Sequence, residues 1–154
     1  GVATAAGCQL VAACDLAVAA EVARFGTSGI NVGLFCTSPG VALSRNVGRK
    51  AVLEMLLTGS LISAQEALLR GLVNRVVPVD KLDEEIAALA ASIVAKSSLA
   101  IGMGKRAFYE QLEMGIDAAY QLAAETMACN MMAADAAEGI DAFTEKRAPV
   151  WRGE

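Results

Sequence analysis

The sequence contains no histidine among its 154 residues. This absence excludes Ser-His and Cys-His catalysis, histidine metal sites and acid–base chemistry by an imidazole. Any chemistry performed by these residues must therefore use carboxylates, backbone donors, amides, hydroxyls or a thiol. Because the four cysteines also form no C-x-x-C pair, the sequence predicts no metal site.

Long hydrophobic runs are also missing, although hydrophobic residues make up 55% of the chain and charged residues only 19%. Charges such as Asp15, Glu21 and Arg24 interrupt the most apolar stretch, and no basic leader precedes an apolar segment. We therefore expect neither a membrane span nor a signal peptide. The high apolar share predicts that part of the surface lies at subunit contacts.

Basic charge is scarce, because the formal net charge is -4. This balance argues against a nucleic-acid partner. The four cysteines, Cys8, Cys14, Cys36 and Cys129, do not make a small cysteine-dense scaffold, which predicts reduced thiols in a reducing compartment. Alanine-rich usage favours the bacterial cytosol, and a mitochondrial location stays open.

Short apolar segments bounded by glycine and proline predict an α/β front half. Small residues at 1–7 allow close approach of backbone to backbone or ligand, and a loop is predicted over 26–33. Because the first motif begins abruptly, we expect further sequence upstream in the whole protein. Helices are predicted over 8–14, 39–47, 51–57 and 63–71, and strands over 16–20, at Phe25 and over 72–77.

Local signals mark several element ends. Ser63 followed by Glu66 predicts a capping box, and Gly71 fits a left-handed position at the end of the same helix. Asp80 is predicted to cap the first helix of an all-helical tail. Further helices are predicted over 101–114, 116–132 and 135–146. The chain therefore divides into a mixed region, residues 1–79, and a helical region, residues 80–154.

The order of these motifs resembles the crotonase superfamily of enoyl-CoA hydratases and isomerases. Residues 5–15 (AAGCQLVAACD) resemble its G-G-G-x-E-L-x-x-x-C-D stretch, and residues 25–33 resemble its F-G-x-P-E-x-x-x-G loop. Residues 58–73 match its T-G-x-x-I-x-A-x-E-A-x-x-x-G-L-V run most specifically. Residues 138–147 resemble its closing helix, so the resemblance covers the whole chain.

The resemblance implies an α/β fold in which residues 1–79 form the C-terminal part of a ββα spiral core. Residues 80–154 would then be a helical oligomerisation region that builds a homotrimer or hexamer. It also implies that an upstream part supplies one oxyanion-hole donor and much of the CoA surface. The expected partner is an acyl-CoA thioester, with coenzyme A as part of the substrate and no separate cofactor.

The site implied by the resemblance lies at the start of the first helix. The N–H of Ala6, with Gly7 beside it, matches a donor that holds the thioester oxyanion, and small side chains allow a carbonyl to approach. Tight packing of a small-residue helix start is the alternative explanation. The two glutamates that activate water in hydratases fall on Gln9, which cannot ionise, and on Gly29, which has no side chain.

Polar residues near the second glutamate position are Ser28, Asn31, Cys36 and Thr37, and no base accompanies Cys36 in sequence. In the closing helix, Phe143 and Lys146 match family residues that contact the adenine and a phosphate of CoA. A core phenylalanine beside a solvated lysine is the alternative for this pair.

The function predicted is that of an enoyl-CoA hydratase/isomerase relative that binds an acyl-CoA thioester, in a branch that lacks the usual glutamates. Ordinary hydratase activity is expected to be slow or absent. Two alternatives stay open: a non-catalytic acyl-CoA-binding or assembly subunit, and a different crotonase reaction such as thioester hydrolysis.

Overall fold

The computed structural model describes all residues from 1 to 154 and contains two compact units, residues 1–88 and 89–154. Their boundary falls inside α5 (Leu82–Val94), the first long helix of the helical region, whereas the change in sequence character lies at residue 79.

Unit 1 contains two small sheets built from short strands. β1 and β3 pair in parallel, with Val2 opposite Arg24, and β4 pairs antiparallel to β3. The second sheet joins β2 and β5 in parallel. The strands are β1 (Val2–Thr4), β2 (Val18–Ala20), β3 (Arg24–Gly26), β4 (Ile62–Ser63) and β5 (Arg75–Val77).

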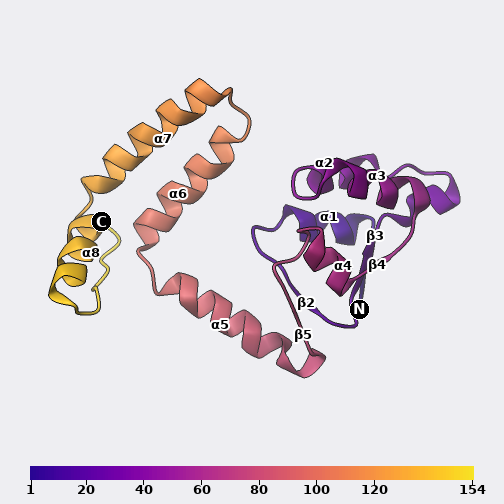
Figure 1. The fold of residues 1–154 in the computed structure, drawn as a ribbon, viewed down its shortest axis with the longest axis horizontal. Helices are drawn as coiled ribbons and strands as arrows, with labels where there is room; N and C mark the ends of the chain where they lie inside the picture. The colour runs from indigo at the N-terminus through magenta and orange to yellow at the C-terminus, as the bar shows by residue number, and fades with distance from the viewer. The chain divides into compact units, whose positions relative to one another are not determined.

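In unit 1, α1 packs on β1 and α2, and α4 packs on β3, β4 and β5, and Figure 1 shows α2 and α3 side by side. The α-helices are α1 (Ala6–Ala13), α2 (Thr37–Ser44), α3 (Arg49–Thr58) and α4 (Ala64–Leu69). Two 3₁₀ turns, η1 (Ser28–Val32) and η2 (Val79–Lys81), link them to their neighbours. Mixed short strands and helices confirm the α/β prediction for this part of the chain.

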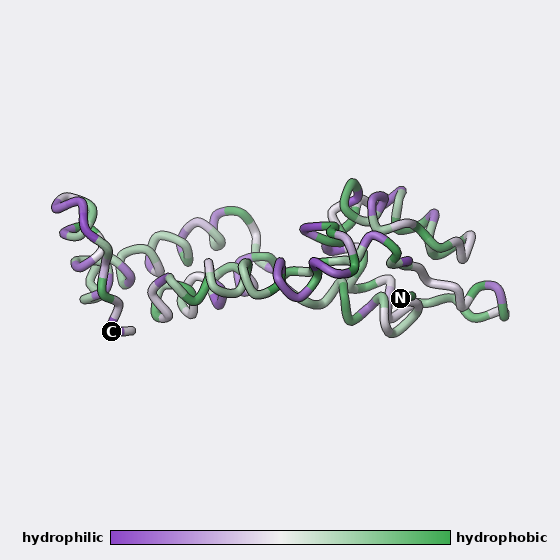
Figure 2. The backbone as a smooth tube through the Cα atoms, turned by 90° about the horizontal axis from the view of Figure 1, so that it is seen from below, coloured by the Kyte–Doolittle hydropathy of each residue, from purple (hydrophilic) through white to green (hydrophobic).

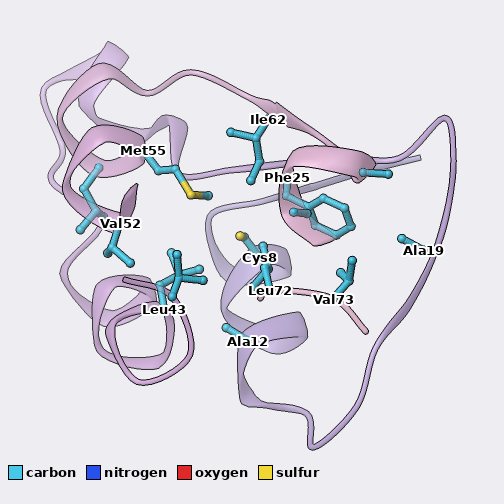
Figure 3. Packing of buried hydrophobic residues seen from close by; sticks show 14 residues of the cluster. Cys8, Ala12, Ala19, Phe25, Leu43, Val52, Met55, Ile62, Leu72 and Val73 are labelled. Atoms are coloured by element: carbon cyan, nitrogen blue, oxygen red, sulfur yellow. The ribbon is translucent and has the colours of Figure 1, made fainter. Parts of the chain in front are cut away.

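One apolar core holds unit 1 together (Figure 3). Cys8 and Ala12, one helical turn apart, bury the same face of α1, and Leu43 of α2 and Met55 of α3 are almost completely enclosed. Each such large side chain contributes about 1.5–3 kcal/mol through burial. Phe25 brings β3 into the same cluster, so the core fixes α1 against the strand that leads into η1.

The capping box of α4 is confirmed. The Ser63 hydroxyl accepts a hydrogen bond from the Glu66 N–H at 3.2 Å, and the Ser63 N–H donates to the Glu66 carboxylate at 2.8 Å. The hydrogen bonds that the Ser63 N–H and the Ser63 hydroxyl donate to the Glu66 carboxylate lower the pKa of that carboxyl. Gly71 has φ 80°, the predicted left-handed conformation after the helix.

Several predicted boundaries are wrong. The strand predicted over 72–77 begins only at Arg75, because the N–H groups of Leu72 and Val73 donate to the Ala67 carbonyl and close the end of α4. Asp80 lies within η2 rather than capping α5.

Unit 2 is helical, with α6 (Ser98–Gln111) and α7 (Ile116–Met131) packed side by side, as Figure 1 shows. α6 begins three residues before the predicted Ile101, because the Ser97 hydroxyl accepts a hydrogen bond from the Ala100 N–H at 3.1 Å. α8 (Ala134–Glu145) completes the unit.

Hydrophobic segments occur along every helix from α5 to α8 (Figure 2), yet few of their side chains are buried. Ala119 and Ala142 are the buried apolar residues of unit 2. No single helix is both long and apolar enough to cross a membrane; segments 79–94 and 98–111 meet that requirement only together, as a pair bent by 99°.

Candidate functional site

The residue before α1 is held in a strained conformation. Ala5 has φ 48° and ψ -115°, a region that side chains rarely adopt. Its N–H donates to the Gly26 carbonyl at 3.0 Å, and its own carbonyl accepts from the Gln9 N–H at 2.9 Å. These bonds tie Ala5 to β3 on one side and to α1 on the other, so they fix where the helix begins.

Ala6 and Gly7 form the first turn of α1, and both are exposed. N–H groups in the first turn of a helix have no intrahelical acceptor, and the helix adds partial positive charge there. A Cβ added at Gly7 would approach only the Ala3 Cβ, at the ordinary distance of 3.9 Å. Packing therefore does not require glycine at this position, and the open surface leaves room for a ligand carbonyl.

Gln9 is the residue directly after the buried Cys8. Its side chain is half-buried and forms no hydrogen bond within the chain. The Cys8 side chain turns into the core, where burial raises the pKa of its thiol and keeps it protonated. The start of α1 thus offers a ligand the side-chain amide of Gln9 and the backbone N–H groups of the first turn.

Gly29 lies in η1 with no room for a side chain. A Cβ placed there would lie 2.6 Å from the Leu34 carbonyl oxygen and 2.8 Å from the Cys36 sulfur. This position, which matches the second family glutamate, therefore has no carboxylate, and its neighbours leave no room for one.

The other polar residues near this loop have separate surroundings. The hydroxyls of Ser28 and Thr4 lie 2.9 Å apart, which joins η1 to the strand before Ala6. The Asn31 amide packs on Gly59, where an added Cβ would lie 2.7 Å from its Oδ1. Thr37 lines a largely apolar cavity of about 390 Å³ between α2 and α3. Of the four polar residues predicted near this loop, only Ser28 has a side-chain hydrogen bond to the segment that leads into α1.

Two carboxylates of unit 1 are engaged away from α1. Glu54 pairs with Arg70 at 3.0 Å, and Glu66 serves the cap of α4. No group of three histidine, cysteine, aspartate or glutamate side chains lies close enough to hold a metal ion. The described contacts thus place no acid beside Gln9.

In unit 2, Phe143 and Lys146 lie at the end of α8. Phe143 is 87% exposed and borders a cavity of about 420 Å³ that is also lined by Ala100, Ile140 and Trp151. Lys146 ends the helix with φ 57°, a left-handed conformation in which glycine or asparagine is usual. Within this chain the Phe143 ring is exposed and does not lie in the core, whereas Lys146 is exposed as the alternative predicts; the contact of this pair with CoA stays a prediction.

The chain after α8 is fastened back onto the helix. Asp135, which is buried, accepts hydrogen bonds from the Ser97 hydroxyl at 2.6 Å and from the Arg152 N–H at 2.7 Å, and these lower its pKa. Glu138 binds both terminal nitrogens of Arg147 and accepts from the Val150 N–H, so its pKa falls to about 2. These contacts hold the end of α8 and the backbone around Lys146 in place.

Residues 1–154 match the family described as enoyl-CoA hydratase/isomerase, so the chain belongs to that family and has the crotonase fold. Among curated relatives, human enoyl-CoA hydratase domain-containing protein 3, mitochondrial, is 53% identical over 100% of this chain and 51% of its own length. The 2,3-dehydroadipyl-CoA hydratase of Escherichia coli is 38% identical over 99% of this chain and 60% of its own length.

Solved structures agree with this assignment. The enoyl-CoA hydratase of Mycobacterium smegmatis matches with a TM-score of 0.96 and 63% identity, covering 98% of this chain and 59% of that one. The human domain-containing protein 3 matches with a TM-score of 0.94 and 54% identity, covering 98% of this chain and 60% of that one. The chain spans about half the length of the curated relatives it matches.

Three features of the site were not predicted: the strain at Ala5, the Ser28–Thr4 pair and the contact of Cys36 with Gly29. Alanine at the first position of a glycine-rich motif was a signal for the strain, because the motif requires a glycine-like conformation there. No local sequence pattern indicates the Ser28–Thr4 hydrogen bond or the contact of Cys36 with Gly29, because each joins residues that meet only after folding.

Proposed function

We propose that the protein binds an acyl-CoA thioester and holds the thioester oxygen at the N–H of Ala6, while enoyl hydration is slow or absent. Membership of the family supports an acyl-CoA ligand. The residues given to the thioester contact and to the lost hydration come from their match to the family motifs, and the geometry around Ala6 and Gly29 supports these roles. No separate cofactor enters the proposal, because coenzyme A arrives as part of the substrate.

The observation that carries the proposal is where backbone strain occurs. Two non-glycine residues of the chain have positive φ, Ala5 at 48° and Lys146 at 57°. Such conformations cost on the order of 1–3 kcal/mol each and cluster at binding sites. Ala5 directly precedes the proposed oxyanion donor, and Lys146 is the proposed phosphate contact.

Hydration is disfavoured because water needs a group that takes and gives protons. Gln9 supplies a neutral amide, which positions a water without accepting its proton. Gly29 supplies nothing, and its surroundings exclude a side chain. Enolate stabilisation by backbone N–H groups does not depend on these carboxylates, so binding and polarisation of the thioester remain.

The CoA end of the ligand is assigned to α8. The exposed Phe143 ring beside an apolar cavity suits stacking with adenine, and Lys146 provides a cation for a phosphate. Gly7 at the other site admits the thioester.

We also propose a homotrimer or hexamer as the working state and the reducing interior of a cell, cytosolic in a bacterium or mitochondrial, as the compartment. The exposed apolar residues of unit 2 support the assembly. The vertebrate relatives are named as mitochondrial.

The proposal is tested with the full-length protein by calorimetric titration with butyryl-CoA and by an absorbance assay of crotonyl-CoA hydration. Binding without measurable hydration is expected. Ala6→Pro removes the donor N–H and should weaken butyryl-CoA binding by about tenfold. Because a proline also restricts the strained Ala5 before it, the thermal melt of this variant is measured beside its binding, and an unchanged Tm assigns the loss of affinity to the N–H. Lys146→Asn should weaken binding of the whole thioester by roughly 3- to 10-fold.

Ser98→Pro is the matched control, because Ser98 holds the equivalent first position of α6. It should bind butyryl-CoA like the parent. Hydration of crotonyl-CoA at the rate of ordinary hydratases would refute the loss of chemistry. Unchanged affinity in Ala6→Pro would refute the oxyanion contact, and binding without turnover of any thioester would favour a non-catalytic subunit.

A further inference from the structure

The chain folds back over Gly29 immediately after η1. Gly33 adopts a left-handed conformation, φ 80°, which reverses the direction of the backbone. The Leu34 N–H then donates to the Gly29 carbonyl at 3.0 Å. Leu34 and Cys36 are thereby brought onto the backbone of Gly29.

Space, rather than backbone angle, forbids a side chain at position 29. Gly29 is not among the glycines with positive φ, so other residues adopt its conformation. An added Cβ would nevertheless lie 2.6 Å from the Leu34 oxygen and 2.8 Å from the Cys36 sulfur, closer than the 3.0 Å that real Cβ contacts respect.

The two neighbours differ in how they can move aside. The Leu34 oxygen belongs to the backbone, whereas the Cys36 sulfur can turn only about its Cα–Cβ bond, on the N-cap of α2, whose carbonyl accepts from the Gly40 N–H at 3.0 Å. Cys36 packs against the core of unit 1, and Leu43 anchors α2 within that core. Making room at position 29 thus requires the backbone at Leu34 to shift and the Cys36 side chain to turn.

We infer that Leu34 and Cys36 close position 29, and that Cys36 is a specificity-determining residue that keeps the site free of a second carboxylate. The inference rests on the proposed function and deepens it: hydration is lost through the packing of the loop as well as through the missing acid. Glutamates introduced together at positions 9 and 29 therefore do not create a hydratase.

A double-mutant cycle on the full-length protein tests this closure by thermal melting. Gly29→Ala should lower Tm by at least about 4 °C, because overpacking displaces the loop. In a Cys36→Gly background the same change should cost roughly half as much, since the sulfur is gone while the Leu34 oxygen stays. Gly102→Ala is the control, because nothing lies within 4 Å of that added Cβ; it should not lower Tm.

Equal effects of Gly29→Ala in the two backgrounds, or a Gly29→Ala protein as stable as the parent, would overturn the inference. If Gly29→Ala alone is insoluble, recovery of soluble protein on adding Cys36→Gly supports the closure, and no recovery contradicts it. The Gln9→Glu/Gly29→Glu protein should not hydrate crotonyl-CoA. Hydration by the parent would instead refute the proposed function while leaving the cycle valid.

Discussion

At the scale of single residues, conformational strain marks the positions where backbone geometry matters most. Ala5 keeps a conformation that suits glycine, although it carries a methyl group. The core holds β3 and α1 on either side of it, and two backbone hydrogen bonds lock it between them. Strain of this kind persists only where the surrounding structure over-determines it.

Replacing Ala5 with glycine should therefore stabilise the protein. Removal of the strain is offset in part by the greater freedom of glycine in the unfolded chain, which leaves a gain of about 1 kcal/mol. We expect Tm to rise by about 2–4 °C in a thermal melt followed by circular dichroism. Binding of butyryl-CoA should be unchanged, because the backbone path stays the same.

The control for this change is Ala13→Gly, at the exposed C-terminal end of the same helix. There the backbone is helical, so glycine should lower stability. A fall in Tm for Ala5→Gly, with the same sign as the control, would show that the positive φ carries no strain.

Sequence reasoning reached the individual site residues through their motif but not through their contacts. Ala6, Gln9 and Gly29 are assigned by their places in the family pattern, and the loss of ionisable groups follows from their identities. The closure of Gly29 by Cys36 could not be predicted in this way, because the two residues are seven positions apart in the sequence and only the left-handed turn at Gly33 brings them together.

At the scale of elements, α8 depends on the chain that follows it. Glu138 accepts from both terminal nitrogens of Arg147, at 2.6 and 3.0 Å, and from the Val150 N–H at 2.8 Å. Asp135 accepts from Arg152 and Ser97. Two carboxylates thus join the helix to the terminal segment.

This arrangement predicts loss of stability in acid. The pKa of Glu138 is lowered from 4.5 to about 2, chiefly by its hydrogen bonds from Arg147. Because the folded pKa is the lower one, the stabilisation is complete above about pH 4.5 and is lost as the pH falls towards about 2. Thermal melts between about pH 7 and 2 should show Tm falling mainly within that window.

Glu138→Gln should lower Tm at neutral pH and reduce its dependence on acid. The matched control is Glu110→Gln on α6, where the exposed carboxylate makes no ion pair in the chain. That variant should keep the acid profile of the parent. Identical profiles for Glu138→Gln and the parent would exclude this carboxylate as the source.

Element types were predicted more successfully than element ends. The capping box at Ser63 is local in sequence, and the structure confirms it. The start of α6 was missed because Ser97 caps it ahead of the first strongly apolar residue. Hydrogen bonds from Leu72 and Val73 back to α4 shorten the following strand, and apolar character alone does not reveal them.

At the scale of the whole molecule, unit 2 exposes too much apolar surface for an isolated domain. Ile116, Tyr120, Met127 and Met131 recur at helical spacing on one face of α7, and all four are exposed. Tyr120 is 72% exposed. Such a stripe is typical of a helix that packs against another subunit.

We therefore expect the full-length protein to sediment as a trimer or hexamer, as proposed above. Tyr120→Glu should shift the equilibrium towards smaller species in analytical ultracentrifugation, because it buries a charge in the contact. Ala118→Glu, an exposed position off the stripe, serves as the control and should assemble normally. A parent protein that sediments as a monomer would contradict the prediction.

The fold class was predictable because the motif order extends over the whole chain, and the trimer or hexamer implied by the resemblance stays a prediction. Gly59 ends α3 and Gly71 follows the end of α4, as the sequence predicts, and both have positive φ. The exposure of Phe143 depends on how few side chains cover α8, and composition does not specify this.

The contact between Gly29 and Cys36 also bears on how such a protein changes over generations. A mutation that restores an acid at position 29 is penalised at once, since the sulfur and the Leu34 oxygen already fill the space. A mutation that removes the thiol first brings no catalytic benefit. Each single step back towards a hydratase is thus neutral or harmful, which makes the loss of the second acid close to a one-way path.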